Sequence, residues 1–378
     1  MSSAEETHGM TQERRGSVER CAHGDIVEYP LAPPLPILPP STAFPFPPSH
    51  LRLPPSPLRV LQVCPSVGTA CGVANFAANL ADALGKRGFE IRTAARFKPT
   101  DADVVLVQHE FGLFDSAALK SALAKCRQKK ILFCHTAGAE IFQEHVDGFL
   151  AMCPGMVRTR KPVCTMPHPG WYGEGLADRR ALQERFGYCE FSCVVGSNGF
   201  ITPPRRFADI VARLLRPAIQ ENCLINLLCS LHAKHDRHFS YVAEEKALRL
   251  LARRNRPYLR LDTSPKSYAE LNLQLQACDL LWCWTDVRSM PYASGTCADQ
   301  YCSGTRQVVV DKLQHSALRG FPNTRFVAGS LDDFLEILIA EIRARRFDRH
   351  DARHLSWDAC AEIPAAFLRG LCLGKQPA

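Results

Sequence analysis

Short apolar runs alternate with amphipathic segments along most of this chain, and that alternation constrains its fold more than any other feature. The run LRVLQVC from Leu58 is followed by GVANFAANLADALGKRG, in which apolar residues recur at helical spacing until Gly88 marks the stop. The same order repeats in DVVLVQHE, SAALKSALAKCRQ and KILFCHTA. Strands that are apolar on both faces and separated by helices require a parallel sheet covered on both sides. The sequence therefore predicts an α/β fold built on doubly wound, Rossmann-like sheets.

A second series of the same kind begins near Cys189. Its predicted strands are FSCVVGSNGF, LINLLCSLH, DLLWCWT and RQVVVD, and its predicted helices are RRFADIVARLL and YAELNLQLQAC. We expect two doubly wound halves, joined near residues 170–188, that face each other across a cleft. Ligands bind such sheets at the carboxyl ends of the strands. Gly72, His109 and His135 are predicted to lie at those ends.

The first part of the chain differs in composition from the rest. Residues 1–57 hold 12 of the 27 prolines, and proline removes a backbone donor and disfavours helix. The sequence predicts an extended or disordered tail. Such a tail could present polyproline segments to a partner, but composition alone implies no recognition site.

We expect this tail to be dispensable for folding. A chain that starts near Leu58 should keep the cooperative thermal unfolding of the full chain, because the tail lacks the periodicity of a packed element. Calorimetry of the two chains checks this, and loss of soluble protein on truncation would show that the tail packs on the core.

Composition excludes several classes of protein. The chain is 46% hydrophobic and 22% charged, as in soluble globular proteins, and no uninterrupted apolar run reaches the roughly 18 to 20 residues of a membrane helix. Its first residues include Glu5 and Glu6 instead of the basic start and apolar core of a secretory signal. We therefore expect a cytoplasmic protein.

Cysteine and histidine are frequent but not arranged as a recognisable metal motif. The 17 cysteines include no CxxC pair, which argues against a zinc ribbon or a compact disulfide framework and favours small buried hydrophobic side chains. His232, His235 and His238 in HAKHDRH are not accompanied by an acidic cluster, so no metal site is predicted there.

The formal charge of +8 is a modest excess. Its densest sources, RRNRPYLR from Arg253 and RARRFDRHDARH from Arg343, are interleaved with polar or acidic residues. Solvated helix faces explain them better than a nucleic-acid footprint, although the excess would also attract an anionic ligand.

The stretch SGTCADQYCSG is a candidate ligand site. A short helix between two glycine-marked turns would direct the free N–H groups at Ser294 and Gly295 toward an anion. Asp299, one turn along, would accept hydrogen bonds from sugar or ribose hydroxyls. The alternative is ordinary turn chemistry.

Several motifs follow one another in order from Leu58 to about Leu371. They are GVANFAANLADALGKRGFEI, DVVLVQHEFGLF, FCHTA, MPHPGW, GSNGFITPPRRFADIVARLL, ACDLLWCWT, ASGTCADQYCSGTRQVVVD and SWDACAEIP. Together they resemble the retaining family-4 glycosyltransferases of the GT-B fold. The resemblance implies an acceptor-side domain at 58–180, a nucleotide-sugar-binding domain at 181–350, and a C-terminal helix at 351–378 that returns toward the N-terminal domain.

The resemblance also implies site residues. His135 would be the catalytic histidine that contacts the transferring sugar, and His109 and Glu110 of the HEFG segment would lie on the acceptor side. The implied donor-binding residues are Gly72, Gly199, Arg205, Ser294, Gly295 and Asp299.

Two of these positions depart from the family's motifs. Arg205 stands where the family usually has lysine, and both residues can hold a diphosphate. Asp299 replaces the second glutamate of a paired motif, whose first glutamate is replaced by Pro291. Trp284 or Tyr292 could stack on the nucleotide base, although tryptophan in LLWCW is more often a core residue.

The leading functional prediction is a retaining, metal-independent glycosyltransferase that moves a sugar from a nucleotide-sugar to a hydroxyl acceptor. The acceptor would be a glycan, a lipid-linked molecule or a small molecule, and no cofactor is implied. Two alternatives stay open: transfer to modified bases of DNA, and a catalytically degenerate GT-B module that binds partners through the tail.

Overall fold

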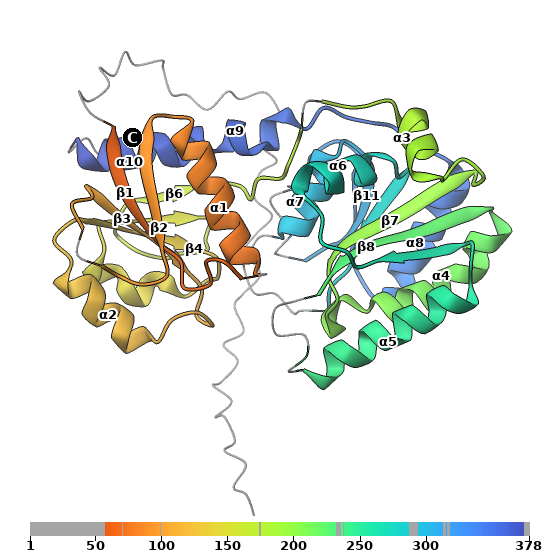
Figure 1. Ribbon diagram of the computed structural model, residues 1–378, viewed down its shortest axis with the longest axis horizontal. Helices are drawn as coiled ribbons and strands as arrows, with labels where there is room; N and C mark the ends of the chain where they lie inside the picture. The colour runs from red at the N-terminus through yellow and green to blue at the C-terminus, as the bar shows by residue number, and fades with distance from the viewer. Residues whose placement is uncertain are drawn as a thin grey trace, which may run out of the picture. The chain divides into compact units, whose positions relative to one another are not determined.

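The computed structural model describes residues 57–373 apart from 70, 99, 174, 232–235, 237, 287–293, 313–314 and 316–317 (Figure 1). The predicted tail up to residue 56 therefore lies outside the described residues. The same holds for His232, His235, Pro291 and Tyr292. Two parallel six-stranded sheets with flanking helices form the fold, as the sequence predicted.

The first sheet has the strand order β2-β1-β3-β4-β5-β6. Its strands are β1 (Leu58–Val63), β2 (Phe89–Ala94), β3 (Val104–His109), β4 (Lys129–Cys134), β5 (Gly148–Ala151) and β6 (Val163–Thr165). The segments α1 (Gly72–Gly85), α2 (Ser116–Lys125) and η1 (Ala139–His145) connect them. All six residues of β3 are buried, as expected for a central strand covered on both faces.

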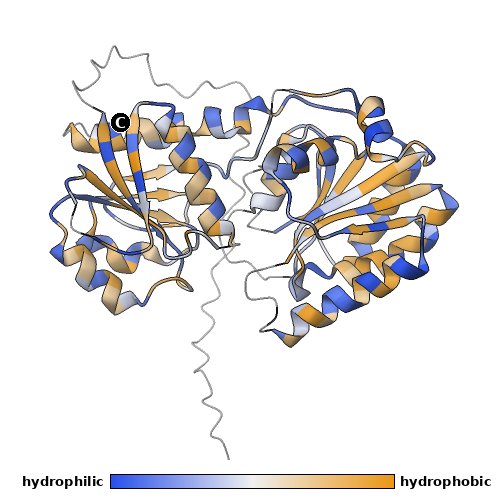
Figure 2. Ribbon diagram, viewed as in Figure 1, coloured by the Kyte–Doolittle hydropathy of each residue, from blue (hydrophilic) through white to orange (hydrophobic). Residues whose placement is uncertain are grey.

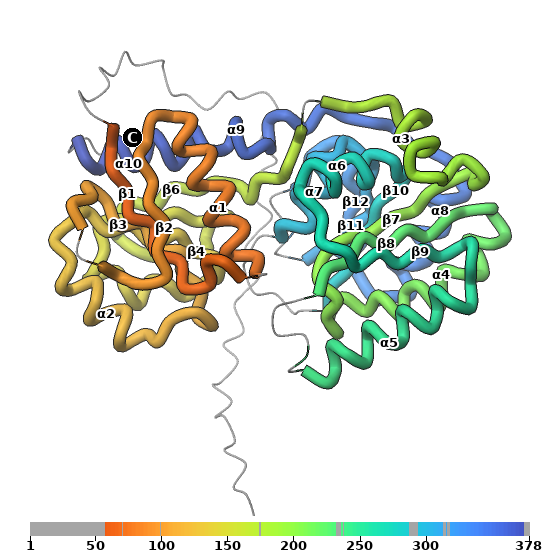
Figure 3. Tube along the Cα trace, viewed as in Figure 1, coloured from red at the N-terminus to blue at the C-terminus, as the bar shows by residue number. Residues whose placement is uncertain are grey.

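The second sheet has the order β12-β11-β10-β7-β8-β9, so the direction of winding reverses between β7 and β10 (Figure 3). Its strands are β7 (Cys193–Phe200), β8 (Cys223–Ser230), β9 (Leu259–Asp262), β10 (Leu280–Cys283), β11 (Arg306–Val310) and β12 (Thr324–Val327). The helical segments around it are α3 (Arg179–Phe186), η2 (Pro203–Arg205), α4 (Phe207–Gln220), α5 (Phe239–Arg254), α6 (Tyr268–Gln276), α7 (Gly295–Cys302) and α8 (Leu331–Ala344). A reversal of this kind opens a ligand position at the carboxyl ends of the two strands that flank it.

The last described segments of the chain are η5 (Arg353–Leu355), α9 (Trp357–Cys360) and α10 (Glu362–Cys372). Helix α10 packs on the first sheet: a Cβ added to Gly148 of β5 would lie 2.9 Å from the Phe367 ring. Arg369 donates to the Arg87 carbonyl at 2.6 Å and covers the Phe89 ring at 4.8 Å. The domain limits at residues 180 and 350 remain predictions.

Hydropathy follows the layers of each sheet. In Figure 2 the strands are mostly apolar, whereas the helices carry both apolar and polar residues. Helix α1 shows the pattern, since it buries Ala74, Phe76, Ala77, Leu80, Ala83 and Leu84. Within the described part of the chain, no helix combines the length and apolar character that crossing a bilayer requires.

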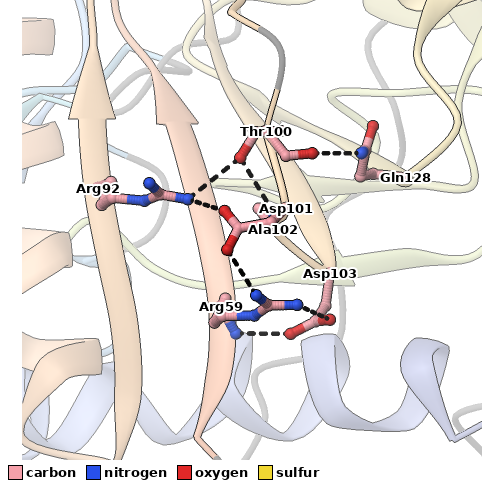
Figure 4. A network of polar contacts seen from close by, with 7 residues as sticks. All are labelled: Arg59, Arg92, Thr100, Asp101, Ala102, Asp103 and Gln128. Carbon is pink, nitrogen blue, oxygen red and sulfur yellow. Dashed lines mark hydrogen bonds and ion pairs between the residues drawn. The ribbon is translucent and has the colours of Figure 1, made fainter.

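A polar network connects the amino ends of β1 and β3 (Figure 4). The Arg59 guanidinium contacts Asp101 at 2.7 Å and Asp103 at 3.3 Å, and Asp101 also pairs with Arg92. The Gln128 amide donates to the Thr100 carbonyl at 3.0 Å. These exposed pairs fix the loop before β3 but contribute little to stability.

The cysteine and tryptophan predictions have clear outcomes. Most of the described cysteines are buried and all are free, in agreement with the prediction of small hydrophobic side chains. Trp284 lies in the core of the second sheet, 5.1 Å from the Phe334 ring, and donates to Asp286 at 3.0 Å. Base stacking by Trp284 is therefore the wrong interpretation, and the core alternative is right.

Candidate functional site

Arg205 lies beyond the carboxyl end of β7, at the last position of η2. Its Nη2 donates to Thr296 Oγ1 at 2.7 Å, and its Nη1 lies 3.6 Å from Cys283 Sγ. Among the described residues, no carboxylate lies within 4 Å of this guanidinium, whereas the next residue, Arg206, is paired with Asp209 and Asp286. A half-buried guanidinium without a carboxylate partner is suited to bind an anionic ligand.

Gly199, near the end of β7, makes room for the Arg205 side chain. Its φ is +117°, a conformation that favours glycine. A Cβ at this position would lie 2.8 Å from Thr296 Oγ1 and 3.2 Å from Arg205 Nη2. Any larger residue would therefore displace the arginine from α7.

Helix α7 begins where the sequence predicted a helix. Ser294 is its N-cap and accepts from the Cys297 N–H at 3.4 Å, and Gly295 is its first residue. A Cβ on Gly295 would lie 3.0 Å from His168 Cε1, so the glycine lets an imidazole approach the helix N-terminus. Gly199, Arg205, Ser294 and Gly295 therefore meet around the first turn of α7.

His168 was not among the predicted site residues, although it belongs to the MPHPGW motif that the resemblance included. Its Nδ1 lies 2.8 Å from the Pro169 carbonyl, which fixes a proton on that nitrogen and leaves Nε2 as the acceptor. Burial lowers its pKa to about 4. Only the tertiary contact with Gly295 identifies it as a site residue.

His135 follows β4 and begins a buried chain of polar side chains. Its Nε2 lies 2.8 Å from Gln108 Oε1, and Gln108 donates to Gln62 Oε1 at 2.9 Å. Because that Gln108 oxygen must accept, His135 carries its proton on Nε2 and Nδ1 is the free acceptor. Burial, together with the neighbouring imidazoles of His168 and His109, lowers its pKa to about 3, so this imidazole is neutral at physiological pH.

His109 is the last residue of β3, as predicted for a strand-end residue. Aromatic rings surround it: Phe111 and Phe142 lie edge-on at 4.8 and 5.0 Å, and Phe114 is stacked at 6.1 Å. Neither ring nitrogen has a hydrogen-bond partner among the described residues, and burial lowers the pKa to about 4. No hydrogen bond between described residues joins His109 or Glu110 to Arg205, so their acceptor-side role stays a prediction.

The remaining two predicted residues lie differently. Gly72 is the exposed first residue of α1, with open space around the position of a Cβ. Asp299 accepts a hydrogen bond from the Trp171 N–H at 3.3 Å, and burial raises its pKa to about 7. With Trp171 and Tyr268 it lines a space too small to hold a water molecule, whereas ligand pockets begin at roughly 300 Å³. This geometry does not test whether Gly72 or Asp299 contacts the donor, so both roles stay predictions.

A larger hollow of about 370 Å³ lies elsewhere, between the amino ends of β3 and β4. It is open to solvent and lined by charged residues such as Asp103, Arg127 and Asp147. Ligands of doubly wound sheets bind at the opposite, carboxyl ends of the strands. The residues around Arg205 also lie at those ends. We therefore place the candidate site at Arg205 and not in this hollow.

Comparison with known proteins supports the fold. No family model matches the chain, and no curated protein matches it. Among solved structures, α,α-trehalose 6-phosphate synthase from Burkholderia multivorans is 11% identical with a TM-score of 0.60, covering 84% of this chain and 99% of that one. The UDP-forming synthase from Burkholderia vietnamiensis is 10% identical with a TM-score of 0.58, covering 84% and 100%. Anabaena Alr3699/HepE, solved in complex with UDP and glucose, is 11% identical with a TM-score of 0.57, covering 84% and 98%. These structural neighbours are GT-B glycosyltransferases, and the chain has their two-sheet GT-B fold.

Proposed function

We propose that this protein is a glycosyltransferase that uses a nucleotide-sugar donor. The observation that carries the proposal is the Arg205 guanidinium, which is held against the first turn of α7 and has no carboxylate partner among the described residues. An arginine beside free helix N–H groups forms a diphosphate site. Structural neighbours of this chain were solved with UDP and with UDP-glucose, which makes a uridine diphosphate sugar the first donor to test.

The proposed reaction needs charge stabilisation more than proton transfer. The diphosphate leaves as the anomeric carbon becomes oxocarbenium-like, and the growing negative charge is met by Arg205 and by the N–H groups at Gly295 and Gly72. We propose transfer with retention and without a metal in the reaction. Asp299 would bind ribose or sugar hydroxyls after releasing its Trp171 contact.

Histidine contributes hydrogen bonds in this proposal. His135 is neutral and tied to Gln108 through Nε2, so its Nδ1 accepts from a hydroxyl of the transferring sugar. A group whose pKa is about 3 is a poor general base at neutral pH, which limits His135 to binding and orientation. His109 and Glu110 would face the hydroxyl acceptor, whose class is open among glycans, lipid-linked molecules and small molecules.

A donor screen tests the proposal. Nucleoside diphosphates and their sugars are added to the full chain, and we expect at least one uridine compound to raise the melting temperature, because a ligand of the folded state stabilises it. The same compound should then release its diphosphate when hydroxyl acceptors are supplied, and NMR of the product should show the donor's anomeric configuration.

Two other outcomes of the screen would redirect the proposal. Binding without turnover over a broad acceptor panel would favour the degenerate module. Transfer only to modified DNA, with binding that weakens steeply as salt rises, would favour the nucleic-acid alternative.

A further inference from the structure

Two thiols and one imidazole from three separate segments lie close together next to Arg205. Cys283 is the last residue of β10, Cys297 lies in the first turn of α7, and His315 follows β11. All three side chains are buried, and their sulfur and nitrogen atoms all lie within 4.8 Å of one another. The distance from Cys283 Sγ to His315 Nε2 is 3.9 Å.

The orientation of His315 is that of a metal ligand. Its Nδ1 lies 2.8 Å from the Val310 carbonyl, so that nitrogen carries the proton and Nε2 presents its lone pair to the two sulfurs. Metal-binding histidines characteristically donate their second ring nitrogen to a carbonyl or carboxylate in this way. The His315 side chain is only 1% exposed, so contact with solvent water does not set the orientation of its ring.

The three side chains form a ligand set of mixed softness, with two sulfur atoms and one imidazole nitrogen. Thiolates are the ligands that soft and borderline divalent metals prefer.

We propose that Cys283, Cys297 and His315 bind one zinc-class divalent ion. With Zn–S near 2.3 Å and Zn–N near 2.0 to 2.1 Å, a tetrahedral site separates sulfur and nitrogen by about 3.5 Å, close to the 3.9 Å between Cys283 and His315. The ion joins the ends of β10 and β11 to the start of α7, and so positions the elements that carry Thr296 and face Arg205. This role goes beyond the proposed transfer, in which the ion takes no chemical part.

Cobalt titration of the full chain tests the site without reference to enzymatic activity. After chelation and removal of the chelator, Co²⁺ should bind at one equivalent and give thiolate-to-cobalt charge-transfer bands with the visible bands of a tetrahedral ion. Zn²⁺ should displace it and raise the melting temperature. Absence of the charge-transfer bands, or a Cys283–Cys297 disulfide in protein kept under a thiol reductant, would overturn the proposal.

Variants assign the ligands. Cys283→Ser should weaken cobalt binding at least about tenfold. The matched control is Cys229→Ala, a buried cysteine of β8 in the same sheet but outside the cluster, which should bind like the wild type. His315→Cys should keep the ion and raise the charge-transfer intensity by about half, because three thiolates replace two; this result is informative even if Cys283→Ser fails to fold. Unchanged cobalt spectra in both Cys283→Ser and His315→Cys would place the ion elsewhere and contradict the assignment.

Discussion

Acidification from pH 6.5 toward pH 4 is expected to unfold this protein. Several histidines are held in the neutral form by burial, and each must gain a proton when the chain unfolds in acid. They are His109, His168 and His350, each with its pKa lowered to about 4, and His135, with its pKa lowered to about 3.

The sign and size of the effect follow from proton counting. An unfolded histidine titrates near pH 6.5, so between pH 6.5 and about 4 the unfolded state binds protons that the folded state excludes, and stability falls as the pH falls. Asp299 acts in the opposite direction, because its raised pKa of about 7 makes the folded state hold a proton above the unfolded value of 3.8. The balance over these five groups is two to three protons near pH 5.5, a slope of roughly 3 to 4 kcal/mol per pH unit. His354, whose pKa burial lowers, adds to this slope, and Glu244 and Asp279, whose pKa values burial raises, reduce it. That slope would remove a typical stability of about 5 to 15 kcal/mol within a few pH units.

Urea unfolding at pH 7.5, 6.5, 5.5 and 5.0 measures this slope. His350→Gln removes one titrating group outside the candidate site, in a side chain that packs 4.2 Å from the Tyr301 ring, and should lower the slope by about one proton. A free energy of unfolding that is constant from pH 7.5 to 5.0 would contradict the prediction.

The sequence predicted most of the central strands and missed the edge strands of both sheets, together with β5, an interior strand of only four residues. Strands β3 and β8 are buried on both faces and read as continuous apolar runs. The strands β2, β9 and β12 are edge strands with partly exposed residues, so their sequences FEIRTA, LRLD and TRFV lack that signal. An edge strand is defined by its single neighbour, which is a tertiary property.

Helix α4 shows how a small boundary error affects a site. The periodicity of RRFADIVARLL predicted a helix from Arg205, but the helix begins at Phe207 because Arg206 adopts a left-handed φ of +49° after two prolines. Arg205 is therefore in the preceding turn, from which its guanidinium reaches Thr296. The prediction identified the residue, and the turn that orients it could not be predicted.

Contacts between distant segments account for the other gaps. His168 meets Gly295, and Cys283 meets His315, only after both sheets have formed. Spacing rules recognise metal ligands that are close in sequence, such as CxxC, and these ligands are not. Asp299 was predicted from its position one turn after Gly295, but the local pattern could not show the hydrogen bond from Trp171.

Replacement of Arg205 by alanine is expected to weaken binding of a nucleoside diphosphate by roughly 30- to 150-fold. Charge-assisted hydrogen bonds to a diphosphate contribute about 2 to 3 kcal/mol. The half-buried Arg205 guanidinium has no carboxylate partner among the described residues, so no ion pair to a carboxylate has to break when the ligand binds. Arg205→Lys should recover most of the affinity, because the family that the chain resembles usually has lysine there. Isothermal titration with UDP measures each constant.

Arg206→Ala is the matched control, since the adjacent guanidinium is already paired with Asp209 and Asp286. It should lower stability slightly and leave UDP affinity within about twofold, because exposed ion pairs contribute at most about 1 kcal/mol. Equal losses in both variants would mean that general positive charge attracts the ligand, which would remove the specific role of Arg205. Unchanged affinity in Arg205→Ala would contradict the diphosphate site itself. Cooperative thermal unfolding of Arg205→Ala near the wild-type melting temperature separates these results from a damaged fold, because a half-buried side chain outside the core contributes more to ligand contacts than to packing.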